Sequence, residues 1–365
     1  AGGGASARAP LATQPLPEAE ATPTDLDAYD DIPVETSGED CPPPVEKFAD
    51  IALHPGLQAN IDAAKFVKPT PVQRHSLSIG IARRDVMACA QTGSGKTGGF
   101  LFPVLHQMLT EIDARTEPEE RIGRSEPRCL ILAPTRELAT QIVREAQKFC
   151  ASTPITPVVV YGGAEIRPQI AALERGCALL VATPGRLCDL IERGKISLTK
   201  IKFLVLDEAD RMLDMGFEPQ IRRIVRVMPP PAQRHTLLFS ATFPETIQKL
   251  AKEFLRPYVW IAVGRVGSTV EGIEQRIWQA AADKRQKLGL VVKALAERDG
   301  RTLVFVEKKR SATWLKRMLT HGGPSDAPAE ERFEPIAAED IHAGLTLTLT
   351  LTLTLTLTPN PKPKP

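Results

Sequence analysis

The sequence predicts an α/β fold built on a parallel sheet that helices cover on both faces. Short runs of almost uninterrupted apolar residues alternate with amphipathic stretches, which indicates strands buried on both faces. Each run ends in polar or glycine residues, the place where open parallel sheets bind ligands. The six expected strands lie within 85–90, 128–134, 157–163, 177–184, 203–210 and 235–242.

The chain divides into segments of different composition. Residues 1–46 are rich in proline, glycine and acids, with too few large apolar residues to offset chain entropy, so we expect disorder there. A nucleotide-binding lobe is expected over 47–262, followed by a glycine-rich hinge. A partial second lobe is expected over 263–344, with strands near 276–281 and 302–307 and helices near 283–297 and 310–320; a low-complexity tail fills 345–365.

The charge is distributed unevenly along the chain. The net charge is +2, but residues 1–46 hold one basic residue against ten acids, a balance of −9, so the remainder carries +11. A basic folded region suits a polyanionic partner. The six cysteines form no C-x-x-C pair, which favours reduced thiols in a cytoplasmic or nuclear protein. There is no apolar run long enough to span a membrane and no signal peptide, so no membrane partner is expected.

The stretch "AQTGSGKT" (90–97) follows the first expected strand. Gly93 and Gly95 would let backbone N–H groups wrap phosphate oxygens, while Lys96 reaches the outer phosphates and Thr97 ligates Mg²⁺. The general phosphate-loop pattern begins with glycine, where this chain has Ala90. The strand before the loop and the helix after it still favour a phosphate site.

Two carboxylates follow a later strand, in "LVLDEAD" (204–210). Asp207 would hold Mg²⁺, usually through water, and Glu208 would orient or deprotonate the water that attacks the γ-phosphate. An acidic tetrapeptide by itself is more often a solvated surface. At the end of an apolar strand, with a phosphate loop upstream, the catalytic interpretation is favoured.

Upstream, "KFVKPTPVQ" (65–73) offers a surface for a base. Phe66 could stack on it, and the amide of Gln73 could read the donor and acceptor edge of adenine, which would select ATP over GTP. The alternative is a packed phenylalanine beside a turn stiffened by proline.

These motifs occur in the order found in the DEAD-box RNA helicases, which the chain resembles from about residue 29 to 320. The closest resemblance is to the branch containing Vasa and its translation-initiation relatives, through "YDDIPVETSGEDCPP" (29–43) and "GRVGST" (264–269). The other motifs are "PTRELA" (134–139), "GG" (162–163), "TPGR" (183–186) and "SAT" (240–242).

The resemblance implies two RecA-like lobes, ATP and Mg²⁺ as cofactors, and RNA unwinding coupled to ATP hydrolysis. It implies catalytic or coupling roles for Lys96, Asp207, Glu208, Ser240 and Thr242, with Mg²⁺ at Thr97 and Asp207. The implied nucleotide contacts are Phe66, Lys68, Gln73, Ala90, Gln91, Thr92, Gly93, Ser94, Gly95, Lys96 and Thr97. The implied RNA contacts are Pro134, Thr135, Arg136, Gly163, Thr183, Pro184, Gly185 and Arg186.

The implied RNA contacts also make physical sense, because each lies where a strand ends and a helix begins. Exposed N–H groups at helix N-termini bind phosphate, so the grip should involve the RNA backbone and carry little sequence information. Protein partners could bind through the N-terminal segment.

The second lobe departs from the family pattern. Residues 321–339 fit poorly, and Arg332 is the only arginine after residue 320, where the family has an arginine motif that reaches the γ-phosphate. Strict Leu-Thr alternation then fills 345–358, and identical dipeptides cannot fix a strand register. We expect translated repeat DNA at a truncated gene end or in a faulty gene model, and impaired activity. The alternative is a non-catalytic fragment that binds ATP and RNA.

Overall fold

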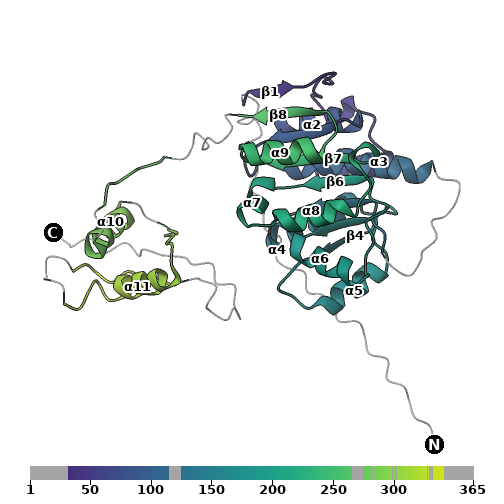
Figure 1. Cartoon of the computed structure of the whole chain (residues 1–365). Helices are drawn as coiled ribbons and strands as arrows, with labels where there is room; N and C mark the ends of the chain where they lie inside the picture. Colours follow the sequence, from purple (N-terminus) through teal and green to yellow (C-terminus); the bar gives the residue numbers. More distant parts are fainter. Residues whose placement is uncertain are drawn as a thin grey trace, which may run out of the picture. The chain divides into compact units, whose positions relative to one another are not determined.

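The computed structural model describes residues 32–114, 125–264, 274–280, 283–297, 300, 302–326, 328 and 332–340. The chain forms two compact units, one up to Thr269 and one from Val270 (Figure 1). Among the described residues, no helix is both long and apolar enough to cross a membrane.

The first unit is built on an eight-stranded sheet in the order β1-β8-β2-β7-β6-β3-β5-β4 (Figure 1). Every neighbouring pair is parallel except β1 with β8. All six expected strands are present, so the predicted α/β fold with a parallel sheet is confirmed. The strands are β1 Val34–Ser37, β2 Asp85–Cys89, β3 Cys129–Leu132, β4 Pro157–Val160, β5 Leu179–Ala182, β6 Phe203–Leu206, β7 His235–Ser240 and β8 Tyr258–Val263.

Helices cover both faces of this sheet. Alternate strand side chains enter two separate cores: Val86 and Ala88 of β2 point into one, Met87 and Cys89 into the other. One core is completed by α1 Pro55–Ala63, α2 Pro71–Ile81, α3 Lys96–Asp113 and α4 Arg136–Phe149. The other is completed by α5 Ile166–Glu174, α6 Pro184–Glu192, α7 Ala209–Asp214, α8 Glu218–Arg226 and α9 Glu245–Phe254. Two short 3₁₀ helices, Phe48–Asp50 and Pro231–Gln233, lie in the connections.

The expectation of disorder throughout residues 1–46 is wrong for β1. This strand pairs antiparallel with β8, which sequence analysis did not identify, in a register that places Val34 opposite Val263. Val45 is also buried in the core of this unit. A four-residue edge strand depends on backbone hydrogen bonds to a partner more than 200 residues away, and composition gives no sign of such a partner.

Glycines let α2 approach α3 closely. A Cβ at Gly99 would lie 2.8 Å from the Ser76 hydroxyl, and one at Gly80 would lie 2.7 Å from Cβ of Pro103. Gly98 is equally crowded, because its Cβ would lie 2.6 Å from Nε2 of Gln73. The close approach brings the first turn of α2 directly against the phosphate loop.

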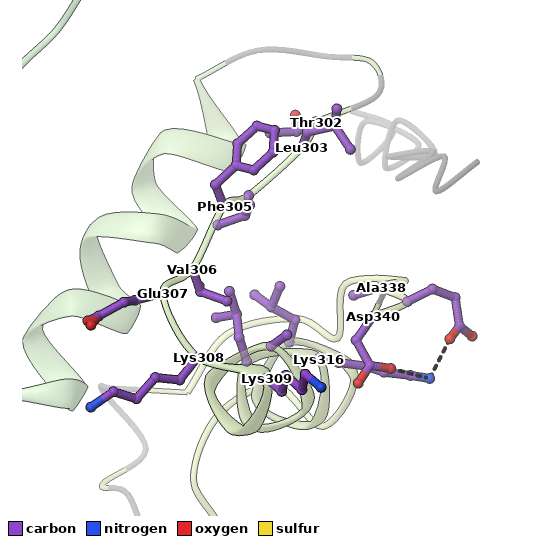
Figure 2. A pocket seen from close by; sticks show the side chains of 15 residues that line it. Thr302, Leu303, Phe305, Val306, Glu307, Lys308, Lys309, Lys316, Ala338 and Asp340 are labelled. Atoms are coloured by element: carbon purple, nitrogen blue, oxygen red, sulfur yellow. Dashed lines mark hydrogen bonds and ion pairs between the residues drawn. The ribbon is translucent and has the colours of Figure 1, made fainter. Parts of the chain in front are cut away.

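The second unit contains the two expected helices, α10 Lys284–Ala296 and α11 Lys309–Thr320. The strands expected near 276–281 and 302–307 are wrong for the described residues, since neither 274–280 nor 302–306 forms a strand. Leu303 is 65% exposed and Phe305 is 90% exposed. Figure 2 shows this extended chain beside α11, bordering a hollow of about 430 Å³.

A strand needs a hydrogen-bonding neighbour, and the described part of this unit supplies none to 302–306. The helices instead form a small core of their own, made of Leu288, Leu295, Leu315, Met318 and Leu319. The hinge residues 265–272 and the Leu-Thr tract 345–358 lie outside the described residues.

Candidate functional site

The predicted motifs follow six neighbouring parallel strands and therefore meet along one edge of the sheet. In the spatial order β2, β7, β6, β3, β5, β4 the strands lead into "AQTGSGKT", "SAT", "DEAD", "PTR", "TPGR" and "GG". The three motifs assigned to ATP chemistry thus occupy one half of the edge, and the three assigned to RNA the other half. The order along the chain does not reveal this separation.

The phosphate loop has the backbone geometry that the motif predicts. Gly93 (φ +83°) and Gly95 (φ +88°) are left-handed, and Gly95 caps the N-terminus of α3. Lys96 is only 7% exposed, and its Nζ donates to the carbonyl oxygen of Ala90 over 2.8 Å. The start of an 18-residue helix and the loop's N–H groups make this a site suited to an anion.

Gln73 braces this loop. Its Nε2 donates to the carbonyl oxygen of Gly95 (2.9 Å), and its Oε1 accepts from the backbone N–H of Thr70 (3.0 Å). The Thr70 hydroxyl donates to the carbonyl oxygen of Ser94 (2.8 Å). Gln73 is 2% exposed, so both ends of its amide are engaged inside the protein. A role in reading adenine would require exchanging at least one of these bonds.

Phe66 is half-buried in a cluster of aromatic rings. It meets Phe48, Phe102 and Phe149 edge-on, with ring centroids 5.5 to 6.4 Å apart. The packed phenylalanine that the sequence left open as an alternative is therefore present. The neighbouring Val67 is 83% exposed and Lys68 is half-buried, so the segment lies at the surface of the lobe.

Asp207 is a desolvated carboxylate at the end of β6. It is 3% exposed, and burial raises its pKa to about 6, against the opposing positive charge of Lys96. A cation beside it would favour the ionised form. No group of three His, Cys, Asp or Glu in the described part of the chain could hold a metal. Mg²⁺ fits such a site, because it commonly takes one or two carboxylates together with water and phosphate oxygens.

Glu208 holds a strained backbone conformation. Its φ is +48° and its ψ is 52°, a left-handed geometry uncommon for a residue with a side chain, and it caps α7. Its backbone N–H donates to Oδ1 of Asp207 over 3.0 Å. Its carboxylate accepts from Nη1 of Arg211 over 3.1 Å. The turn thus places the two carboxylates on consecutive residues at the edge of the sheet.

Asp210 is a functional candidate that sequence analysis missed. Its Oδ2 accepts from the backbone N–H of Ala241 (3.2 Å) and from both the N–H and the hydroxyl of Thr242 (each 2.9 Å). Asp210 therefore ties "DEAD" to "SAT". Its place in the tetrapeptide was the only available signal, since the partner becomes visible only when β6 and β7 are neighbours. The hydroxyl of Ser240 is buried and has no partner in the described structure.

The residues predicted to grip RNA surround one hollow of about 590 Å³. Six of the eight line it: Pro134, Thr135, Arg136, Thr183, Gly185 and Arg186. Gly163 follows the lining residue Gly162, and Pro184 is the buried first residue of α6. Glu137, Asp189, Met215 and Phe217 complete the lining.

Two arginines of this hollow are held by different contacts. Arg186 donates from Nη2 to the carbonyl oxygen of Ala164 over 2.9 Å, while its buried Nη1 has no partner among the described residues. Arg136 is exposed, and its Cζ lies 4.9 Å from the ring centroid of Tyr161. Their guanidinium groups lie beside the N-termini of α4 and α6, in a hollow that the carboxylates of Glu137 and Asp189 also line.

Comparisons with known proteins agree with this architecture. A sequence model described as DEAD/DEAH box helicase matches residues 70–250. Among solved structures, the crystal structure of the yeast DEAD-box splicing factor Prp28 is similar with a TM-score of 0.59 and 30% sequence identity. The similarity covers 81% of this chain and 67% of that chain.

Proposed function

The chain belongs to the DEAD-box helicase family, and we propose that it binds ATP with Mg²⁺ and couples ATP hydrolysis to RNA binding and local duplex unwinding. The observation that carries the proposal is the arrangement of motifs along one sheet edge. The phosphate loop and the two carboxylates lie on one side, and a hollow lined by arginines and helix N-termini lies on the other.

On the nucleotide side, the N–H groups of residues 91–97 and Lys96 hold the phosphates, and Thr97 and Asp207 hold Mg²⁺. Bound ATP would supply the phosphoryl group, and bound Mg²⁺ would neutralise charge on its oxygens. Glu208 orients the attacking water and accepts its proton. Phe66, Lys68 and Gln73 form the side facing the base, with Gln73 exchanging its bond to Gly95 for one to adenine.

On the RNA side, the N-termini of α4 and α6 and the guanidinium groups of Arg136 and Arg186 contact the phosphate backbone. The hydrogen bonds between Asp210 and Thr242 support the coupling of ATP hydrolysis to RNA binding, because they join the segment carrying Glu208 to the segment carrying Ser240. Membership of the branch containing Vasa remains a prediction that depends on residues 29–43 and 264–269.

We further propose that this chain hydrolyses ATP far more slowly than a relative that carries the arginine motif, and that it does not separate duplexes. An arginine finger contributes about 10³–10⁵ in rate, and Arg332 is the only arginine after residue 320. Among the described residues of the second unit, the exposed apolar segment 302–306 forms no strand. The same observations favour the alternative of a non-catalytic ATP- and RNA-binding fragment.

Nucleotide binding tests the first half of the proposal. Lys96→Ala should weaken ATP binding without changing the melting temperature by more than a few degrees. Gln73→Ala should narrow the preference for ATP over GTP. Thr70→Val, which removes the hydroxyl bond to Ser94 and the Thr70 side-chain part of the α2 capping box, should weaken the binding of both nucleotides equally. Fluorescent-nucleotide titration of the full chain makes the comparison, and equal affinity of the parent for ATP and GTP would contradict an adenine-reading site.

RNA binding and unwinding test the second half. Binding to single-stranded RNA should be salt-sensitive and nearly independent of sequence, and Arg186→Ala should lower it uniformly. A strong preference for one RNA sequence would contradict a backbone grip. Robust unwinding by the 365-residue chain, lost in Glu208→Gln, would contradict the proposed impairment.

A further inference from the structure

Tyr161 lies outside every motif assigned above, yet it contacts one of the proposed RNA ligands. It follows the last residue of β4 and directly precedes the glycine pair. The guanidinium of Arg136 lies over its ring, 4.9 Å from the centroid. Strand β5 separates β3, which leads to Arg136, from β4, which leads to Tyr161. The pair therefore bridges two loops of the hollow that are not adjacent in the sheet.

The backbone of Tyr161 is fixed on both sides by one buried amide. Gln169 of α5 accepts from the Tyr161 N–H through Oε1 (3.0 Å) and donates from Nε2 to the Tyr161 carbonyl oxygen (3.2 Å). The following N–H, of Gly162, donates to the hydroxyl of Thr183 over 3.2 Å. Gln169 is 9% exposed, so water competes little for its bonds. The side chains of Gln169 and Thr183, from two other segments, therefore fix the backbone that carries the ring.

Stacking suits a phosphate-binding arginine better than an ion pair does. A guanidinium over an aromatic face keeps its charge and leaves the N–H groups at its edge free to donate. Glu137 also lines the hollow and could draw Arg136 into an ion pair that competes with RNA, whereas Asp189 already pairs with Arg193. Holding the long side chain in place beforehand also lowers the entropy lost on binding.

We propose that Tyr161 is a positioning residue for RNA: its ring holds the guanidinium of Arg136 at the mouth of the hollow, ready to receive a backbone phosphate. Gln169 fixes the ring's backbone. The inference rests on the proposed RNA-binding function and adds to it a residue that acts through Arg136, without contacting RNA itself.

The test is a double-mutant cycle on the full chain, with a fluorescein-labelled single-stranded oligouridylate as probe and anisotropy measured at several KCl concentrations. Tyr161→Ala should weaken binding roughly two- to fivefold, the range expected for an exposed cation–π contact. Tyr161→Phe, which keeps the ring, should bind as the parent does. In an Arg136→Ala background, Tyr161→Ala should cause no further loss.

Arg144→Ala is the matched control, because Arg144 is an exposed arginine two turns further along α4. It should weaken binding less than Arg136→Ala, which should also lower the salt slope by about 0.7, the value of one single-strand phosphate contact. Equal melting temperatures of the Tyr161 variants and the parent would exclude a folding effect.

Two results would overturn the inference: a loss in Tyr161→Phe as large as in Tyr161→Ala, or a further loss when Arg136 is already absent. After either result, the proposed contact between Arg136 and RNA still holds if Arg136→Ala itself weakens RNA binding. If the parent does not bind the probe, or if Arg136→Ala and Arg186→Ala bind as the parent does, the proposed function fails and the inference fails with it.

Discussion

Two segments of this chain have almost the same sequence and opposite environments. Residues 236–239 read Thr-Leu-Leu-Phe and residues 302–305 read Thr-Leu-Val-Phe. In the first, Leu237, Leu238 and Phe239 are fully buried in β7; in the second, Leu303 and Phe305 are 65% and 90% exposed. Apolar β-branched and aromatic composition therefore marks a candidate strand, but the neighbours decide whether a strand forms.

The neighbours of β7 supply what residues 302–306 lack. It lies between β2 and β6, bonded in parallel register to both, with helices over each face. The backbone N–H and C=O groups of residues 302–306 have no sheet partner in the described structure. Burial of this segment without those bonds would be unfavourable, because the desolvation of its unpaired N–H and C=O groups costs more free energy than the burial of its apolar side chains contributes.

The largest expected difference comes from placing a charge in each segment. Phe239→Lys should unfold the first unit, since it buries an unpaired ammonium and removes a ring packed on Phe100 at 5.4 Å. Phe305→Lys should leave that unit's urea midpoint unchanged and lower self-association, because it interrupts an exposed apolar edge. Urea unfolding followed by near-ultraviolet circular dichroism, with sedimentation velocity for association, makes the comparison.

Phe305→Leu is the control for the second substitution, since it keeps the apolar character and should keep the association. If Phe305→Lys destabilised the chain as much as Phe239→Lys does, residues 302–306 would be buried in solution and the contrast between the two segments would fail.

A buried carboxylate at the start of β2 bonds to β7 and to the segment that precedes β8. Asp85 is fully buried and accepts from Nη2 of Arg256 (2.6 Å), from its backbone N–H (2.8 Å) and from the N–H of Thr236 (3.1 Å). Asp85→Ala leaves two backbone N–H groups without this acceptor, while the guanidinium, which is 33% exposed, keeps its bond to the Arg83 carbonyl oxygen. We therefore expect a loss of about 3 kcal/mol in unfolding free energy. The urea midpoint measures it.

Arg256→Lys serves as the comparison for Asp85→Ala, because it keeps the charge and loses only the forked geometry. Arg256→Lys should lower the free energy of unfolding by clearly less than Asp85→Ala does. Equal losses in the two variants would mean that the geometry of the pair matters and the buried charge does not.

His235, the first residue of β7, should make the first unit sensitive to acid. Burial lowers its pKa to about 4, and its ring nitrogen Nε2 donates to the carbonyl oxygen of Arg84 over 2.8 Å. Asp85 opposes the shift, while Arg256 and Arg83 add to it. Because the unfolded chain takes up the proton first, stability is intact above pH 6.5 and falls between pH 6.5 and 4, by up to about 3 kcal/mol.

Urea titrations from pH 4 to 8 check this expectation, with His235→Gln as the non-titrating variant. The difference in unfolding free energy between parent and variant should shrink as the pH falls. A difference independent of pH would show that His235 does not stay neutral in the folded state.

The smallest expected effect compares one helix cap in each unit. The hydroxyl of Thr135 accepts from the N–H of Leu138 (3.3 Å), and the carboxylate of Asp283 accepts from the N–H of Gln286 (2.9 Å). Thr135→Ala should lower the free energy of unfolding of the first unit by about 1 kcal/mol. Asp283→Ala should leave that transition untouched and reduce the helical signal of α10. A shift of the first unit's midpoint by Asp283→Ala would mean that the two units unfold together.

The sequence by itself determined the elements whose signals are local. The six predicted strands are mainly apolar, so composition alone could identify them. Five of them are buried along their whole length, whereas β4, at the end of the sheet, buries only alternate residues. The phosphate loop, "DEAD" and the residues predicted to contact RNA could likewise be found from motif and spacing. Helices α10 and α11 were predicted near their observed positions because helical periodicity needs no distant partner.

Tertiary structure decided everything that depends on residues far apart in the chain. It placed β1 beside β8 although composition suggested disorder, and it left 302–306 without a partner although composition suggested a strand. It also joined Asp210 to Thr242 and Arg136 to Tyr161. Strand pairing and side-chain bonds between loops are set by which strands become neighbours, and a periodic pattern within one segment carries no information about that choice.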